Sequence, residues 1–181
     1  MQITKTDLEG CFVIEPKTYK DERGVFFESY NKRTFEELTN QNIDFVQDNQ
    51  SVSSKGVLRG LHFQKGEYAQ AKLVRVLKGS VQDVVVDVRP KSKTFGNHFS
   101  TKLSEENNKQ LFVPKGFAHG FLVLEDDTVF SYKCDNFYNK ESEAGIIYND
   151  ISLGIFWETL EIPYILSEKD LKLPKLKDLI L

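Results

Sequence analysis

The chain has 181 residues, of which 40% are hydrophobic and 28% are charged, and its formal net charge is −3. This length suits one domain with a sizeable core, and the mild negative charge argues against a dedicated nucleic-acid binder. No apolar run reaches the roughly 18 residues that a membrane helix needs, and MQITKTDLEG lacks the apolar core of a signal peptide. Cys11 and Cys134 fit no metal or redox spacing. We expect one cytoplasmic domain over residues 1–181, with reduced thiols and no membrane or nucleic-acid partner.

Strand signals dominate the pattern. Short β-branched and aromatic runs, separated by turn residues at intervals of about 8–12 residues, are typical of a β-sandwich or barrel. We expect strands within residues 10–16, 24–31, 56–64, 71–79, 80–90, 97–104, 109–116, 118–126, 128–138 and 153–158. Helical signals are few: a short helix over 32–41, one turn over 104–108, and a second helix over 167–172, where Ser167 and Asp170 have capping-box spacing. The apolar tail, 171–181, is expected to pack against the body.

Several of these strands place one polar group among apolar neighbours on a single face, because side chains alternate along a strand. The groups are Lys72 beside Val74 and Val76, Asp83 beside Val85, His119 beside Phe121 and Val123, and Tyr132 between Phe130 and Cys134. A barrel interior that serves as a ligand pocket produces this pattern.

Two motifs resemble the signatures of the cupin superfamily. VPKGFAHGF, residues 113–121, contains P-x-G-x-x-H, and Gly56 to His62 resembles the first cupin motif. The resemblance implies a mainly β, double-sheet jelly roll. Metal-dependent cupins continue the first motif as His-x-His, whereas position 64 is Gln64 and the chain has 3 His. We therefore expect no metal ion; a metal-dependent cupin dioxygenase is the alternative that predicts bound iron.

Longer blocks are similar to the dTDP-4-dehydrorhamnose 3,5-epimerase family, over about residues 5–175. They are DERGVFFESYN, FVQDNQSVSSKGVLRGLHFQ, AKLVRVLKGSVQDVVVDVR, TFG, LSEENNKQLFVPKGFAHGFLVL, YKCDNFYN and GIIYND. The chain departs from the family in the approach to Lys72, which has Ala71 for Gly and no Pro, and in having Tyr148 and Ile151 where Trp and Pro are common.

The resemblance implies a catalytic set of four residues and no cofactor. Epimerisation beside a keto group needs a base, a group that stabilises the enolate, and an acid on the opposite ring face. His62 would be the base, oriented by Asp170; Lys72 would stabilise the enolate; Tyr132 would be the acid. Without the resemblance, these four read as a surface strand histidine, a helix cap, a solvated lysine and a core tyrosine.

The resemblance also implies binding positions for the nucleotide and sugar. They are Arg23, Glu28, Gln47, Asn49, Arg59, His119, Tyr138, Glu143 and Lys169. Arginine suits a diphosphate because its planar fork bonds two oxygens at once. Asp83, a lone acid on an apolar face, is a candidate partner of His119. The family forms homodimers whose N-terminal strands cross to the partner, so Arg23 and Glu28 are expected to complete the neighbour's site.

The segment VLRGLHFQ, residues 57–64, poses a geometric problem. Strict alternation puts Arg59 and His62 on opposite faces, whereas the resemblance needs both at the substrate. A bulge or sharp twist at Gly60 would solve this; otherwise Arg59 must reach round an edge or serve the partner's site.

The expected function is epimerisation of dTDP-4-dehydro-6-deoxy-D-glucose at C3 and C5 in dTDP-L-rhamnose biosynthesis. A C3-only or C5-only epimerase, or one acting on another nucleotide-linked 4-keto sugar, stays open. A non-catalytic cupin that binds nucleotide sugars is an alternative from another class, and it predicts binding without proton exchange.

Overall fold

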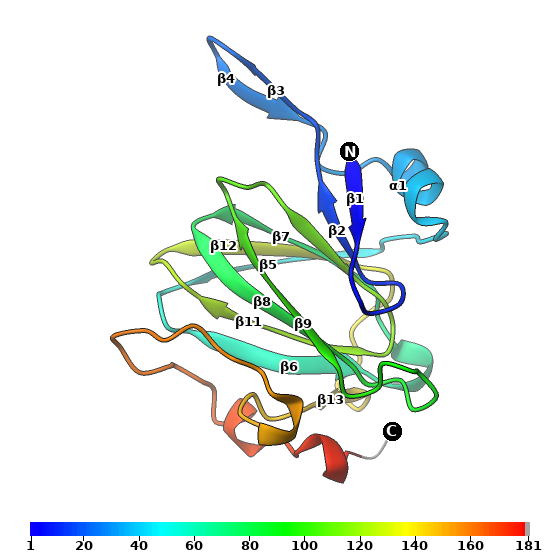
Figure 1. Ribbon diagram of the computed structural model, residues 1–181, viewed down its shortest axis with the longest axis vertical. Coiled ribbons are helices and arrows are strands. Elements are labelled where there is room, and N and C mark those ends of the chain that lie inside the picture. Colours follow the sequence, from blue (N-terminus) through cyan, green and yellow to red (C-terminus); the bar gives the residue numbers. More distant parts are fainter. Residues whose placement is uncertain (180–181) are drawn as a thin grey trace.

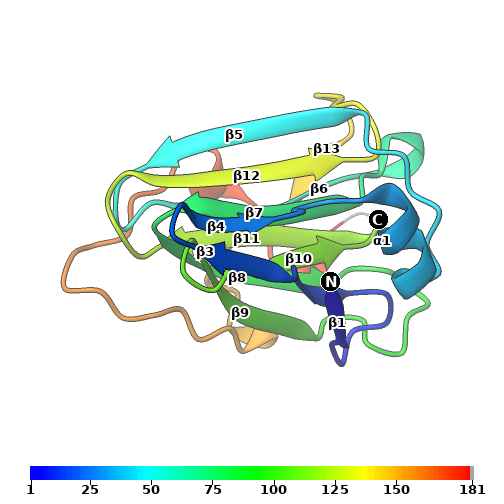
Figure 2. The ribbon, with the colours of Figure 1, turned by 90° about the horizontal axis from the view of Figure 1, so that it is seen from above.

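The computed structural model describes residues 1–179, which form two facing antiparallel sheets (Figure 1). The strands are β1 (Gln2–Lys5), β2 (Phe12–Glu15), β3 (Thr18–Asp21), β4 (Gly24–Phe27), β5 (Gln47–Ser53), β6 (Leu58–Gln64), β7 (Lys72–Lys78), β8 (Ser80–Asp87), β9 (His98–Ser104), β10 (Gln110–Val113), β11 (Phe117–Val123), β12 (Thr128–Cys134) and β13 (Glu143–Gly145). One sheet has the order β1-β2-β10-β7-β12-β5, and the other has the order β13-β6-β11-β8-β9. Figure 2 shows β5, β12 and β7 running side by side.

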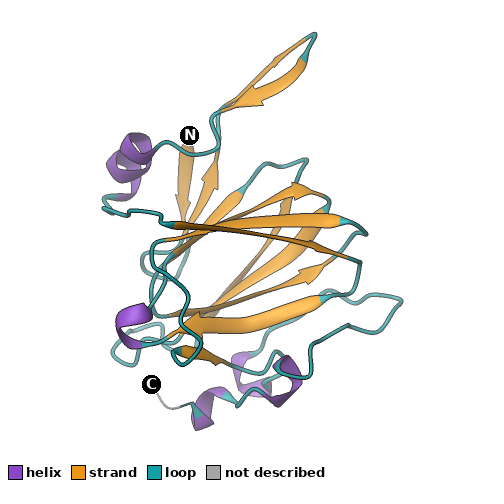
Figure 3. Ribbon diagram, turned by 180° about the vertical axis from the view of Figure 1, so that it is seen from behind, coloured by secondary structure: helices purple, strands orange, loops and turns teal. Residues whose placement is uncertain are grey.

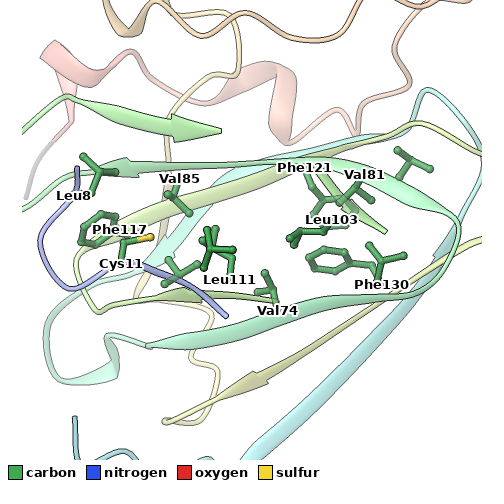
Figure 4. Packing of buried hydrophobic residues seen from close by; sticks show 14 residues of the cluster. Leu8, Cys11, Val74, Val81, Val85, Leu103, Leu111, Phe117, Phe121 and Phe130 are labelled. Atoms are coloured by element: carbon green, nitrogen blue, oxygen red, sulfur yellow. The ribbon is translucent and has the colours of Figure 1, made fainter. Parts of the chain in front are cut away.

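The main core lies between the two sheets (Figure 4). Val74 and Phe130 of the six-stranded sheet and Val85 and Phe121 of the five-stranded sheet belong to one buried cluster, and the rings of Phe121 and Phe130 stack at 4.0 Å between centroids. Side chains alternate between the two faces of each strand, and those of β8 that point outward, such as Val84 and Val86, belong to a second buried cluster. The arrangement confirms the mainly β, double-sheet jelly roll expected from the sequence.

Helices lie outside the sheets (Figure 3). Helix α1 (Lys32–Thr39) begins where the Asn31 side chain accepts a hydrogen bond from the Thr34 N–H, and ends at Asn40, which has a left-handed φ of 56°. Its Phe35 is fully buried against Phe112 of β10, with ring centroids 5.1 Å apart. The predicted helix over 32–41 is therefore confirmed.

The C-terminal segment covers the outer face of the five-stranded sheet. It contains short 3-10 turns η2 (Ile151–Leu153), η3 (Asp170–Lys172) and η4 (Leu176–Asp178), after η1 (Gly66–Tyr68) earlier in the chain. Leu176 and Leu179 pack against the buried cluster on that face, as expected for the tail, whose residues 180–181 lie outside the described part. The predicted turn over 104–108 is confirmed by a hydrogen bond from the Asn108 N–H to the Ser104 carbonyl at 3.0 Å.

Two expectations need correction. Residues 153–158 do not form a strand: the Phe156 carbonyl and the Glu158 N–H bond the Gln82 side chain at 2.8 and 2.7 Å instead of a neighbouring strand. The helix expected over 167–172 is shortened to η3, although Ser167 Oγ does accept a hydrogen bond from the Asp170 N–H. The pattern also missed β1, β3, β5 and β13, which are polar or very short.

The hairpin of β3 and β4 projects away from both sheets (Figure 1). It carries exposed apolar side chains, and Phe26 is 73% exposed. Nothing else in residues 1–179 pairs with its edges. An apolar hairpin of this kind is a surface that another chain can cover.

Candidate active site

A cleft of about 630 Å³ opens between the two sheets. Eight of the predicted site residues line it: Asn49, Arg59, His62, Lys72, His119, Tyr132, Lys169 and Asp170. They come from β5, β6, β7, β11 and β12 and from the start of η3. The fold therefore brings together groups that are spread over most of the sequence.

His62 and Asp170 form a tight pair in this cleft. Nε2 of His62 lies 2.6 Å from Oδ1 of Asp170, and the two side chains are 28% and 6% exposed. Burial alone would raise the pKa of Asp170, but hydrogen bonds from His62, Ser167 and the backbone of Gly60 outweigh it, so its pKa is lowered. Asp170 is thus an ionised carboxylate on the imidazole, and Ser167 caps the same turn.

A bulge in β6 lets Arg59 and His62 share the cleft. His62 pairs with His119, yet Arg59 pairs with Phe121, so three steps along β6 match two along β11. Gly60, at φ 122°, lies at the shift, and a Cβ there would stand 2.6 Å from Cα of Gly120. Only glycine tolerates this approach and this backbone angle. The predicted irregularity at Gly60 is confirmed, and both side chains line the cleft.

Tyr132 and Lys72 lie on the six-stranded sheet, with the Lys72 amine 5.8 Å from the centre of the Tyr132 ring. Burial raises the pKa of Tyr132 above its ordinary value, so the phenol remains a proton donor. Burial lowers the pKa of Lys72, and Cys134, Asp83 and Glu143 oppose this only in part. No ion pair joins Lys72 to a carboxylate in the described part of the chain, so its charge is available to a ligand.

His119 and Asp83 form a second histidine–carboxylate pair. Nε2 of His119 is 3.0 Å from both oxygens of Asp83, and the side chains are 6% and 0% exposed. Asp83 on β8 lies behind His119 on β11, opposite Phe121. The partner expected for Asp83 from its lone acidic position is therefore present.

The rim of the cleft carries a chain of polar contacts. The Tyr138 hydroxyl donates to Glu143 Oε2 at 2.9 Å, and Glu143 also pairs with Lys169. Burial would raise the pKa of Glu143, but Lys169 and Tyr138 lower it overall. Gln47 accepts a hydrogen bond from the Tyr138 N–H at 3.2 Å and donates to Asn49 at 3.0 Å.

Arg23 and Glu28 do not line the cleft of their own chain. Arg23 lies at the turn of the projecting hairpin, where its side chain is 89% exposed and pairs with Asp21 at 2.5 Å. Glu28 follows β4 and accepts a hydrogen bond from Asn31 at 3.1 Å. The isolated chain thus separates these two residues from the other site candidates.

Some cleft residues were missed by the sequence reasoning. Ser51 lines the cleft, and Ile165 pairs with Val57 along the cleft wall; next to the cleft, Ser53 Oγ accepts a hydrogen bond from Arg59 Nη2 at 3.1 Å. The alternation of Gln47, Asn49, Ser51 and Ser53 was the available signal, but it was hidden because all four are polar and the one apolar residue of β5, Val52, points outward.

Several neighbouring features bear on other readings. A smaller hollow of about 320 Å³ lies behind β7 and β12, and His is not among its lining residues. Gln64 accepts a hydrogen bond from the Asn139 N–H at 3.0 Å.

Within residues 1–179, no group of three His, Cys, Asp or Glu is placed to hold a metal ion, and no helix is long and apolar enough to span a membrane. Cys11 and Cys134 are buried free thiols, as expected.

Comparison with known proteins identifies the family of this chain. The family model of dTDP-4-dehydrorhamnose 3,5-epimerase matches residues 5–178. The dTDP-4-dehydrorhamnose 3,5-epimerase of Salmonella typhimurium is 50% identical over 100% of this chain and 98% of its own length. The crystal structure of the same enzyme from Elizabethkingia anophelis has a TM-score of 0.94 and 58% identity, covering 98% of this chain and 97% of that one.

A third relative was solved with a ligand. The dTDP-6-deoxy-D-glucose-3,5-epimerase RmlC of Legionella pneumophila, in complex with dTDP-4-keto-L-rhamnose, has a TM-score of 0.93 and 48% identity, with 97% of this chain and 93% of that chain covered. The family match, the full-length identity and the fold all point to the family that the sequence motifs resemble. The chain belongs to the dTDP-4-dehydrorhamnose 3,5-epimerase family.

Proposed function

We propose that this enzyme epimerises dTDP-4-dehydro-6-deoxy-D-glucose at C3 and C5, giving dTDP-4-dehydro-L-rhamnose for dTDP-L-rhamnose biosynthesis. The observation that carries the proposal is the His62–Asp170 pair, at 2.6 Å, in the same cleft as Lys72 and Tyr132. A base, a cation and an acid around one cleft are what proton exchange beside a ketone needs. The names of the relatives support the substrate.

The reaction begins with proton removal from the carbon beside the keto group. His62 takes the proton, and Asp170 stabilises the imidazolium that results. The electron pair moves to the carbonyl oxygen, where the Lys72 ammonium stabilises the enolate more than the ketone. Tyr132 then donates its phenolic proton to the carbon from the opposite ring face. No electrons leave the sugar, so the reaction needs no redox cofactor.

The nucleotide occupies the wider part of the cleft and its rim in this proposal. Arg59 and Lys169 supply positive charge for the diphosphate. Tyr138, which is 52% exposed, offers a face on which the base stacks, and Gln47 and Asn49 offer amide groups for its edge. The buried His119–Asp83 pair contributes a histidine to the wall beside the sugar.

A homodimer completes the site in this proposal. The hairpin of β3 and β4 extends into solvent with Phe26 exposed, and it carries Arg23 far from the chain's own cleft residues. Pairing across a two-fold axis would cover the hairpin and deliver Arg23 and Glu28 to the partner's nucleotide. We propose a cytoplasmic location as well, in keeping with the two free thiols.

Subunit mixing tests the shared site. Arg23→Ala and His62→Ala homodimers are each expected to be nearly inactive. After mixing and exchange, a heterodimer has one site with both native residues, so activity returns to about a quarter of the wild-type value for random pairing. No recovery from two stable, exchanging dimers would show that the sites are not shared.

Deuterium exchange tests the reaction itself. The enzyme is incubated in D2O with dTDP-4-dehydro-6-deoxy-D-glucose, and deuterium at C3 and C5 is followed by NMR. Exchange at both carbons is expected. Exchange at one carbon would indicate a C3-only or C5-only epimerase, and exchange with a different nucleotide-linked 4-keto sugar would change the substrate. Binding without exchange would leave a nucleotide-sugar-binding cupin.

A further inference from the structure

The junction between the end of β12 and the start of β7 is held by one acidic residue. Asp135, directly after β12, receives a hydrogen bond from the Ala71 N–H on its Oδ1 at 2.7 Å. The Asp135 N–H in turn donates to the Ala71 carbonyl at 3.1 Å. Ala71 is 2% exposed and directly precedes Lys72. Asp135 therefore forms two hydrogen bonds, one through its side chain and one through its main chain, to the residue that precedes Lys72.

These two hydrogen bonds extend the pairing of β7 with β12 by one residue pair beyond the end of β12. Lys72 pairs with Cys134, so Asp135 stands opposite Ala71 in the antiparallel register. In a regular ladder, the Ala71 N–H would bond the main-chain carbonyl of the residue opposite. Here the Asp135 carboxylate takes the place of that carbonyl. The chain is thus free to turn away towards Tyr138 while the start of β7 stays paired.

Lys72 needs such support because of where it lies. It is the first residue of β7, after the loop that contains η1, and strand ends are where pairing is weakest. Its side chain has a flexible four-carbon stem. Two further hydrogen bonds join the loop before β7 to the turn after β12. Gln70 donates to the Asn136 carbonyl at 2.8 Å. Asn136 Nδ2 donates to the Glu67 carbonyl at 2.8 Å.

The charge of Asp135 is balanced away from the cleft. Its Oδ2 lies 3.0 Å from the Lys115 ammonium, and the Asp135 side chain is 7% exposed. No ion pair joins Asp135 to the Lys72 amine within residues 1–179. Asp135 is not among the residues that line the cleft and forms no ion pair with Lys72, so it acts on Lys72 through the backbone of Ala71, by a charge-assisted hydrogen bond.

We propose that Asp135 is a positioning residue for Lys72: it fixes the first residue of β7 so that the amine meets the oxygen on which enolate charge develops. The inference rests on the proposed epimerase function and adds a residue to it. A small displacement of the stabilising charge weakens its interaction with the enolate oxygen in the transition state, while substrate binding elsewhere in the cleft is kept.

Steady-state kinetics of three variants test this. Asp135→Ala is expected to lower kcat about tenfold and to leave KM within about twofold. Asp135→Asn keeps an oxygen acceptor for the Ala71 N–H, so its kcat should stay within about threefold of wild type. Asp126→Ala is the matched control, because Asp126 accepts the Lys55 N–H at 3.0 Å in an exposed turn. It should leave kcat unchanged.

A double-mutant cycle shows whether Asp135 acts through Lys72. In a Lys72→Met background, Asp135→Ala should alter the slow residual exchange by less than twofold. A carbon-13 titration of the Lys72 side chain should show the pKa of Lys72 raised towards its ordinary value in Asp135→Ala, because a loosened amine reaches water. Full additivity in the cycle, or lost stability with unchanged kcat and Lys72 pKa, would overturn the proposal. Absence of exchange by the wild type would instead refute the epimerase function.

Discussion

Nε2 of His62 lies 2.6 Å from Oδ1 of Asp170, although the two residues are 108 positions apart in the chain. Asp170 reaches the imidazole because the C-terminal segment crosses the mouth of the cleft, held at Ile165 by hydrogen bonds to Gly56 and Leu58 at 2.8 and 2.9 Å. The same aspartate was a plausible helix cap by sequence, and Ser167 does bond its N–H at 3.1 Å. Its burial against His62 gives it a second contact that a simple cap does not have.

Substitution of His62 removes the proposed base. His62→Ala is expected to abolish deuterium exchange at C3 and C5, while dTDP affinity stays within about threefold, because the cations for the diphosphate remain. Asp170→Asn should lower kcat about a hundredfold, since an amide does not stabilise imidazolium. NMR exchange and calorimetric titration with dTDP provide the measurements. Normal turnover by His62→Ala would refute the assignment of the base.

Tyr132→Phe separates proton return from binding. Loss of the phenolic proton is expected to lower kcat about a hundredfold, with dTDP affinity within about twofold. Burial raises the pKa of Tyr132 above 10.0, so the acid stays protonated at neutral pH and any loss of activity from its ionisation falls above pH 10.0. The kcat–pH profile checks both points. Unchanged kinetics in the variant would mean that water or another group returns the proton.

Lys72→Met should make the enzyme more stable and less active. Burial lowers the pKa of Lys72 below its ordinary 10.5, so the folded state disfavours the charged amine. Between the lowered pKa and 10.5 the unfolded chain binds more protons, and wild-type stability from this group rises with pH. The variant lacks this penalty, so its Tm should rise by about 2–4 °C at pH 7, while kcat falls about 10²-fold.

Thermal unfolding between pH 7 and pH 10.5 measures this effect. The stability difference between Lys72→Met and the wild type should shrink as pH rises. If the variant were less stable than the wild type at pH 7, this would contradict the interpretation that burial of the charged Lys72 amine destabilises the folded protein. Ser131→Ala, on the outward face of the neighbouring strand β12, serves as the control and should shift neither Tm nor kcat.

Asp87→Asn tests a buried carboxylate outside the cleft. Burial alone would raise the pKa of Asp87, but hydrogen bonds from Arg89, Ser92 and Thr94 lower it from 3.8 to about 2. A carboxyl group whose pKa is lower in the folded than in the unfolded protein stabilises the fold at every pH above the pKa of the unfolded state. That stability is lost as pH falls from about 4 towards 2. The variant should lose about 2 kcal/mol of unfolding free energy at pH 7. Urea unfolding at pH 7 and pH 3 measures it; an equal loss at both would contradict the linkage.

Local pattern alone predicted much of this protein. The runs from 56 to 64 and from 71 to 79 are strands because β-branched and aromatic residues alternate with others there, and Lys72 and Tyr132 share faces with valine and phenylalanine for the same reason. Strand β5 was not predicted because its inward-facing side chains are polar, and two of them, Asn49 and Ser51, line the cleft instead of an apolar core.

Tertiary structure decided which of these groups meet. Local pattern determined most of the core strands and the faces of their side chains, because alternation is a property of neighbouring residues, and the resemblance to the family supplied the base, acid and cation candidates. The bulge at Gly60, the His62–Asp170 contact and the pairing of His119 with Asp83 depend on strands and segments far apart in the chain. Strand register and long-range packing set those contacts, and the pattern of a sequence does not show which distant residues come close in space.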